Sequence, residues 1–165
     1  MKTCSLLLLI CLTLFGCGGG DEPEPPAAKQ TATATATAAA EGEEAVTAMF
    51  DDYREALGAR DWDRACSHLA PETTEKLQQN IKQLGVTDPP SECPALMDQL
   101  YTTIDKDPAA KKTIDEITET AEVKDVKLNG EQASVTWSAK VNGQDTPVTQ
   151  TARLIDGEWK LIDVN

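Results

Sequence analysis

The chain has 165 residues and a formal net charge of −13, from 28 acidic and 15 basic residues. Most of the acidic excess lies in residues 41–165, where the charges are dispersed along the sequence. Such a surface repels nucleic acid and anionic lipid, so we expect neither to bind it directly.

Residues 1–16 combine Lys2 with an apolar run from Leu6 to Phe15. The run is shorter than the roughly 20 residues that cross a bilayer and is typical of a secretory signal. Leu14-Phe15-Gly16-Cys17 resembles the lipobox of bacterial lipoproteins. The resemblance implies that Cys17 is acylated, becomes the first mature residue and holds the protein outside the cytoplasm on the cell membrane. The alternatives are an ordinary signal peptide and a buried apolar N-terminus with a chance cysteine.

Residues 17–40 follow as a tract rich in Gly, Pro, Thr and Ala, including GGG, DEPEPP and TATATATAAA. The tract has no apolar periodicity and few side chains to bury, which predicts a disordered tether behind the lipidated cysteine. An O-glycosylated stalk is the alternative for the Thr-Ala repeat. Residues 41–165 are then one domain, large enough for its own core.

If the lipobox is real, two of the five cysteines of the chain are left to form a disulfide. Cys4 and Cys11 leave with the signal, and lipidation occupies Cys17, so Cys66 and Cys93 remain. Each lies on the apolar side of a predicted helix, and disulfides persist outside the cytoplasm. We therefore predict a Cys66–Cys93 disulfide, with two buried free thiols as the alternative.

The first half of the domain is predicted to be helical. Apolar residues at three- and four-residue steps indicate a helix from Ala45 that Gly58 ends, and Asp61 is the expected N-cap of a short second helix. A third helix is expected to end at Gly85, Ser91 is expected to cap a fourth, and Asp107-Pro108 is expected to open a fifth. The apolar positions are Ala45, Val46, Met49, Phe50, Tyr53, Ala56, Leu57, Trp62, Ala65, Leu69, Leu77, Ile81, Leu84, Leu96, Met97, Leu100, Tyr101 and Ile104.

The second half is predicted to be an antiparallel meander, because Asn129-Gly130, Asn142-Gly143 and Asp156-Gly157 each favour a two-residue hairpin. With ideal turns, one face of four strands becomes apolar and Lys140 meets Asp145 on the other face. The predicted inner pairs are Val126–Ala133, Ala133–Ala152, Trp137–Val148, Leu154–Trp159, Ala152–Leu161 and Gln150–Asp163. The fold class is therefore α+β, with N-terminal helices packed on a curved antiparallel β-meander.

One set of residues in the domain matches a known superfamily pattern: Tyr53, Leu57, Asp61, Ala65-Cys66, Leu69-Ala70-Pro71, Cys93, Val123, Val126, Gly130, Ala133, Val135 and Asp156-Gly157-x-Trp159-x-Leu161. With these residues the mature domain resembles the NTF2-like (SnoaL-like) superfamily, in the branch found on secreted bacterial lipoproteins. The resemblance covers nearly all of 41–165 and implies a cone in which the helices pack on the curved sheet. Because this superfamily contains isomerases, cyclases and modules without chemistry, the resemblance does not assign an activity.

The motifs of the common enzyme classes are missing from the sequence. His68 is the one histidine, no Cys-x-x-Cys or Gly-x-Ser-x-Gly occurs, and we expect no metal and no cofactor. We interpret His68 as a surface or boundary residue, with a general base as the alternative. In the resembled isomerases a carboxylate and a Tyr work in the cone, which makes Asp163 and Tyr53 the candidates here. The expected pocket residues are Gln150, Asp163, Trp137, Trp159 and Tyr53.

The leading interpretation is a membrane-anchored, non-catalytic binding or interaction module of the cell envelope. Its partner would be an envelope protein or a small apolar ligand. An isomerase- or cyclase-like enzyme that uses Asp163, and a purely structural envelope module, are the alternatives.

Overall fold

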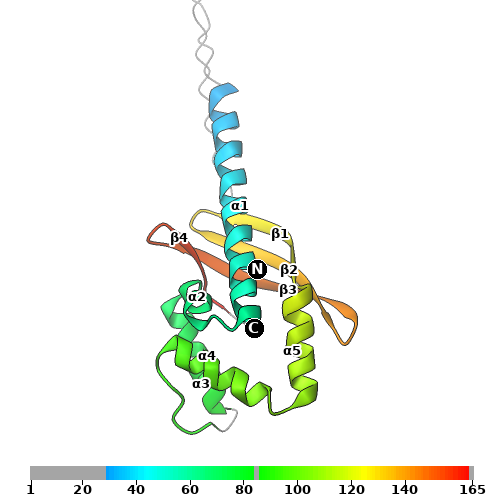
Figure 1. The fold of residues 1–165 in the computed structure, drawn as a ribbon. Helices are drawn as coiled ribbons and strands as arrows, with labels where there is room; N and C mark the ends of the chain where they lie inside the picture. Colours follow the sequence, from blue (N-terminus) through cyan, green and yellow to red (C-terminus); the bar gives the residue numbers. More distant parts are fainter. Residues whose placement is uncertain (1–28, 84–85, 164–165) are drawn as a thin grey trace, which may run out of the picture.

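The structure is a computed structural model that describes residues 29–83 and 86–163. Within these ranges the chain is α+β, with five helices and a four-stranded antiparallel sheet of order β1-β2-β3-β4 (Figure 1). The helices are α1 (Lys29–Ala59), α2 (Trp62–Ser67), α3 (Pro71–Gln83), α4 (Cys93–Ile104) and α5 (Pro108–Thr120). The strands are β1 (Glu122–Asn129), β2 (Gln132–Val141), β3 (Gln144–Ile155) and β4 (Glu158–Leu161).

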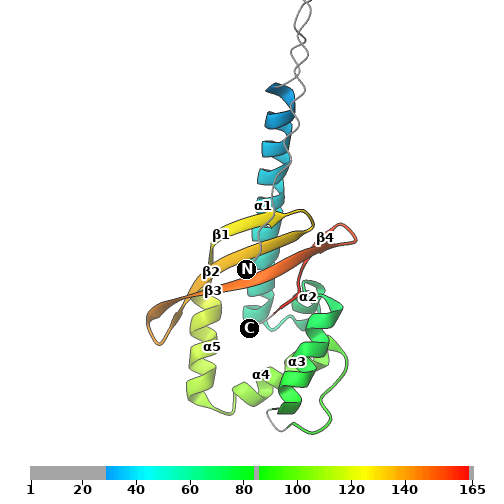
Figure 2. The ribbon, with the colours of Figure 1, turned by 180° about the vertical axis from the view of Figure 1, so that it is seen from behind.

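The sheet has one face covered by α1, with α5 beside it, whereas Figure 2 shows no described helix on the opposite face. The short α2 packs against the C-terminal part of α1, and α3 and α4 form a layer beside it (Figure 1). The N-terminal part of α1 projects beyond the sheet (Figures 1 and 2). The predicted α+β class, with helices on one face of a meander, is therefore confirmed.

The predicted apolar face of the sheet is the buried one, because strand side chains alternate between faces. Ala133, Val135, Trp137 and Ala152 are all buried, and Lys140 forms its expected ion pair with Asp145 on the other face. The main cluster of buried residues joins α1, α2 and the sheet. It consists of Val46, Met49, Phe50, Tyr53, Ala56, Ala65, Leu69, Ala133, Val135, Trp137, Ala139, Ala152 and Leu161.

The predicted register is confirmed for the second and third hairpins, whose pairs include Trp137–Val148 and Leu154–Trp159. In the first hairpin it is wrong by two positions, since Val126 lies opposite Val135. The turn there begins at Gly130, whose φ of +61° is the lone positive φ of that turn, as a type II′ turn requires. A shift of two keeps every side chain on its predicted face.

The helix boundaries differ from the prediction at α1. The helix begins at Lys29, whereas the predicted tether extends to residue 40. Alanine has the highest helix propensity, so an Ala-rich segment can extend a helix whose later turns are packed on a sheet. The helix also continues past Gly58 to Ala59, and Arg60 takes the left-handed conformation that ends it, with φ of +57°.

The other helix ends show which cap predictions hold. The Asp61 carboxylate accepts from the Arg64 N–H, as predicted, and the Asp107 carboxylate accepts from the Ala109 N–H at the expected start of α5. The predicted Ser91 cap is wrong, because Glu92 occupies the N-cap position of α4 and makes no side-chain cap bond. The predicted end of the third helix at Leu84 and Gly85 lies outside the described residues.

The predicted disulfide is present in the structure and joins α2 to α4. The Cα atoms of Cys66 and Cys93 lie 5.9 Å apart, inside the range of about 4.4–6.8 Å that a disulfide requires. The bond ties the helical layer to α2, which itself packs against α1.

Candidate functional site

A cavity of about 150 Å³ lies between α1, α5 and the covered face of the sheet. The apolar face of the meander faces the amphipathic side of α1 here, and α5 closes one side. The lining residues are Phe50, Tyr53, Arg54 and Leu57 of α1, Ile117, Thr118 and Ala121 of the α5 region, Trp137 of β2 and Gln150 of β3.

Trp137 and Gln150 form a polar contact within this mostly apolar cavity. The Trp137 indole Nε1 donates a hydrogen bond of 2.9 Å to Oε1 of Gln150, and both side chains are buried. An indole nitrogen can only donate, so the amide oxygen must be the atom that faces it. The two amide N–H groups of Gln150 therefore point elsewhere, and they have no partner among the described residues.

Tyr53 brings a neutral hydroxyl to the same place. Its side chain is 9% exposed, and desolvation raises the pKa of the phenol above its ordinary value. The hydroxyl therefore remains protonated at neutral pH and is available as a donor. Across residues 41–83 and 86–163, it makes no hydrogen bond to another side chain or to the backbone.

Arg54 contributes the one ionised group in the cavity lining. Its Nη1 donates to the Thr118 carbonyl at 3.2 Å, and its Nε is buried without a hydrogen-bond partner among the described residues. Arg54 is not among the predicted pocket residues, although its position in the helix carries a signal for it. Arg54 lies four residues after Phe50 and three before Leu57, so the helical period puts it on their face.

The expected pocket residues are thus only partly brought together. Tyr53, Trp137 and Gln150 line the cavity, whereas Asp163 and Trp159 do not. The Asp163 carboxylate accepts a 2.8 Å bond from the Thr151 N–H, because β4 ends at Leu161 and the predicted Gln150–Asp163 pair does not form. Trp159 is half-buried opposite Leu154 and packs against the edge of the core.

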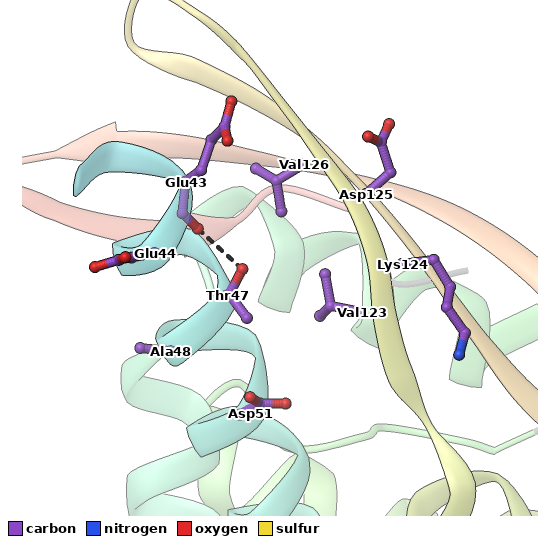
Figure 3. Close-up of a pocket in the computed structure, with 9 residues that line it drawn as sticks. All are labelled: Glu43, Glu44, Thr47, Ala48, Asp51, Val123, Lys124, Asp125 and Val126. Carbon is purple, nitrogen blue, oxygen red and sulfur yellow. Dashed lines mark hydrogen bonds between the residues drawn. The ribbon is translucent and has the colours of Figure 1, made fainter. Parts of the chain in front are cut away.

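A second hollow is an open groove of about 560 Å³ between α1 and β1 (Figure 3). Val123 and Val126 point into it from the strand, and Glu43, Glu44 and Asp51 lie on the helix side. The groove lies next to the irregular pairing at Lys124, where the register of β1 shifts. Such a bulge and charged residues commonly protect an edge strand from pairing.

A charged cluster links α1 to α2 outside both hollows. The Asp52 carboxylate accepts bonds from the guanidinium of Arg64 and lies 2.5 Å from the Nε2 of His68. The bond from Arg64, with that from His68 next, lowers the pKa of Asp52 from 3.8 to about 2. The Ser67 hydroxyl donates to the Arg64 carbonyl, so these residues form no Ser-His-Asp triad. The cluster joins two helices electrostatically.

Neither a metal site nor a membrane-spanning helix is found among the described residues. In residues 29–83 and 86–163 no group of three or more His, Cys, Asp or Glu side chains could hold a metal ion. Over the same part of the chain, no helix has both the length and the apolar character of a membrane span. Cys17 lies outside the described residues.

Comparisons with known proteins give no family match for this chain. No protein-family model matches it, and no curated protein and no solved structure has significant similarity to it.

Proposed function

We propose that this chain is a membrane-anchored extracytoplasmic lipoprotein whose NTF2-like domain binds a small ligand in the cavity without catalysing a reaction. The lipobox-like Leu14-Phe15-Gly16-Cys17 supports the anchor, and the Cys66–Cys93 disulfide agrees with an oxidising compartment. Helices on one face of an antiparallel meander, with a hollow between them, support the NTF2-like assignment.

The observation that carries the binding function is the composition of the cavity. Its walls are mostly apolar, with the Gln150 amide, the Tyr53 hydroxyl and the Arg54 guanidinium as its main polar groups. Ligand sites commonly combine apolar walls with a few polar groups that fix orientation. Apart from Tyr53, none of the described residues that line it is of a type usual for proton transfer or nucleophilic attack, since Asp, Glu, His, Cys and Lys are all missing from the lining.

A cavity-filling variant tests the binding function. Ala121 lines the cavity, so Ala121→Leu should occupy part of it and abolish uptake of small fluorinated ring compounds by the full chain, measured by ¹⁹F NMR. Ala109→Leu makes the same change at an exposed position of α5 and should leave uptake unchanged. Uptake that survives Ala121→Leu, or that the wild-type chain lacks, contradicts the proposal.

The anchor has its own test. Cys17→Ala should release the protein from the membrane fraction or block its processing, because it removes the thiol that carries the lipid. Cys11→Ala changes another cysteine of the N-terminal segment and should leave anchoring intact. A Cys17→Ala protein that is processed normally and remains on the membrane contradicts the lipoprotein assignment.

A second candidate function is the docking of a basic protein segment in the groove between α1 and β1. The acidic side chains of Glu43, Glu44 and Asp51 beside the apolar Val123 and Val126 favour it (Figure 3). Reversing two charges with Glu43→Lys and Glu44→Lys should then weaken capture of envelope proteins while leaving ligand uptake in the cavity unchanged.

A further inference from the structure

We propose that the cavity is selective for a small monocarboxylate with a single ring or short branched chain as its apolar body, and that Arg54 binds the carboxylate. This inference rests on the proposed function and adds to it the chemical class of the ligand.

The size of the cavity limits the apolar body. Drug-sized ligands occupy pockets of about 300–1,000 Å³, whereas an engineered cavity of about 150 Å³ holds one benzene molecule. The present cavity, also about 150 Å³, therefore suits one six-membered ring or a branched chain of similar size. The rings of Phe50 and Trp137, whose centroids are 5.6 Å apart and whose planes are tilted by 39°, make part of its wall aromatic.

The polar groups of the cavity offer more free hydrogen-bond donors than free acceptors. The amide oxygen of Gln150 is occupied by the indole of Trp137, which leaves its two N–H groups free. The Tyr53 hydroxyl is a further donor, and Nε of Arg54 is another N–H without a partner in the described part of the chain. A ligand that satisfies this set must supply hydrogen-bond acceptors, and a carboxylate supplies two acceptor oxygens.

The charge of Arg54 also favours an anionic ligand. Among the described residues, the other three arginines each pair with a carboxylate: Arg60 with Asp105, Arg64 with Asp52 and Arg153 with Glu72. Arg54 has no such ion pair with any of the described residues, although the domain is strongly acidic. A partly buried cation without a counter-ion is unfavourable, so a bound anion would remove that penalty.

One cation and a set of neutral donors match a single negative charge. A planar carboxylate fits the guanidinium fork through two parallel bonds, and its attraction is strengthened where water is excluded. A phosphate dianion would carry two negative charges against one arginine and would be too bulky beside a ring in this volume. The net charge of −13 further opposes ligands with more than one negative charge.

The test compares two probes of nearly equal size on the full chain by ¹⁹F NMR at fixed ionic strength. The anionic probe is 4-fluorobenzoate and the neutral probe is 4-fluorobenzyl alcohol. We expect the wild-type chain to bind the benzoate at least tenfold more tightly, which corresponds to about 1.4 kcal/mol. This comparison needs no variant and so does not depend on the folding of one.

The matched variants are Arg54→Gln and Arg153→Gln, which remove the same charge inside and outside the cavity. Arg54→Gln should weaken benzoate binding about tenfold and leave the alcohol within twofold, whereas Arg153→Gln should change neither. If both probes bind equally well, or if Arg54→Gln leaves benzoate binding intact, the carboxylate inference is overturned and the binding function stands. If neither probe binds, both are overturned.

Discussion

The body formed by α1, α2 and the sheet and the layer formed by α3 and α4 are held in place by different kinds of contact. In the body, one apolar helix face lies on one apolar sheet face, and a single continuous cluster of buried side chains joins them. Buried residues of the layer such as Ile81, Leu96 and Met97 lie outside that cluster. The layer is fastened to the body by a disulfide, by the aromatic contact between Trp62 and Tyr101, and by polar contacts.

These polar contacts converge on Leu161 at the end of β4. Its carbonyl accepts bonds from the Ala70 N–H at 2.9 Å and from the Thr73 hydroxyl at 2.8 Å, and its N–H donates to the His68 carbonyl at 2.8 Å. The cavity lies in the body, on the side that α5 closes, and the layer does not line it. Ligand binding and the attachment of the layer should therefore respond to different substitutions.

The largest effect should come from Trp137→Ala, which removes the biggest side chain of the core. As a large-to-small change at a buried site it should lower the unfolding free energy by about 3–5 kcal/mol, measured by urea denaturation of the full chain. Lys140→Ala, on the opposite face of the same strand, should cost less than about 1 kcal/mol. Similar losses for the two variants would mean that the inner and outer faces are misassigned.

Removing the disulfide should be the largest perturbation of the layer. The Cys66→Ser and Cys93→Ser double variant opens a loop whose ends are 27 positions apart, which should cost about 3–4 kcal/mol in the chain-entropy estimate. Hydrogen exchange should rise more in α3 and α4 than in α1 and the sheet. Uniform acceleration across the chain would contradict the division into two regions.

Thr73→Val tests the contact at Leu161 with little change in shape. Thr73 is fully buried, and the loss of its bond should cost about 0.5–1.5 kcal/mol. Thr103→Val removes a similar bond to the Gln99 carbonyl on the exposed side of α4 and should cost less. Equal effects in urea denaturation would show that the Leu161 contact contributes no more than an ordinary surface bond.

The smallest effect should be the pH dependence contributed by Asp52. Its pKa is lowered from 3.8 to about 2, so its ion pairs stabilise the folded state above about pH 4 and are lost as the pH falls towards 2. Asp52→Asn should flatten the decline of unfolding free energy over that interval. Arg64→Gln should do the same, and the double variant should add little. An unchanged slope in both single variants would contradict the assignment.

The sequence predicts the arrangement of the body well, because period-two alternation and two Asn-Gly or Asp-Gly turns fix which face of each strand is buried. It misplaces the first hairpin by two residues, since Asn129-Gly130 and Gly130-Glu131 are both acceptable turns and both leave the same side chains inside. The extension of α1 to Lys29 is not predicted, because the segment has no apolar periodicity. Such periodicity indicates a helix that packs against other elements, whereas this segment has mainly the high helix propensity of alanine.

The candidate site was predicted in part for a similar reason. Tyr53, Trp137 and Gln150 follow from register and helical period, whereas Asp163 was placed by extending the β4 pairing beyond Leu161, where the strand ends. The helical period puts Arg54 on the face of Phe50 and Leu57, but its place in the cavity also depends on α5, which comes from a distant part of the sequence. The packing of α5 against α1 is a long-range contact, and such contacts have no local sequence signal.

The most direct test of the account follows side-chain N–H resonances in ¹H–¹⁵N spectra of the full chain as 4-fluorobenzoate is added. The Trp137 indole N–H and the Gln150 side-chain amide are in contact with one another and line the cavity, so both should shift. The indole resonances of Trp62 and Trp159, which lie outside it, should remain in place. Shifts at Trp62 or Trp159 without shifts at Trp137 and Gln150, or no shift at any of them, would contradict the assignment of the cavity as the ligand site.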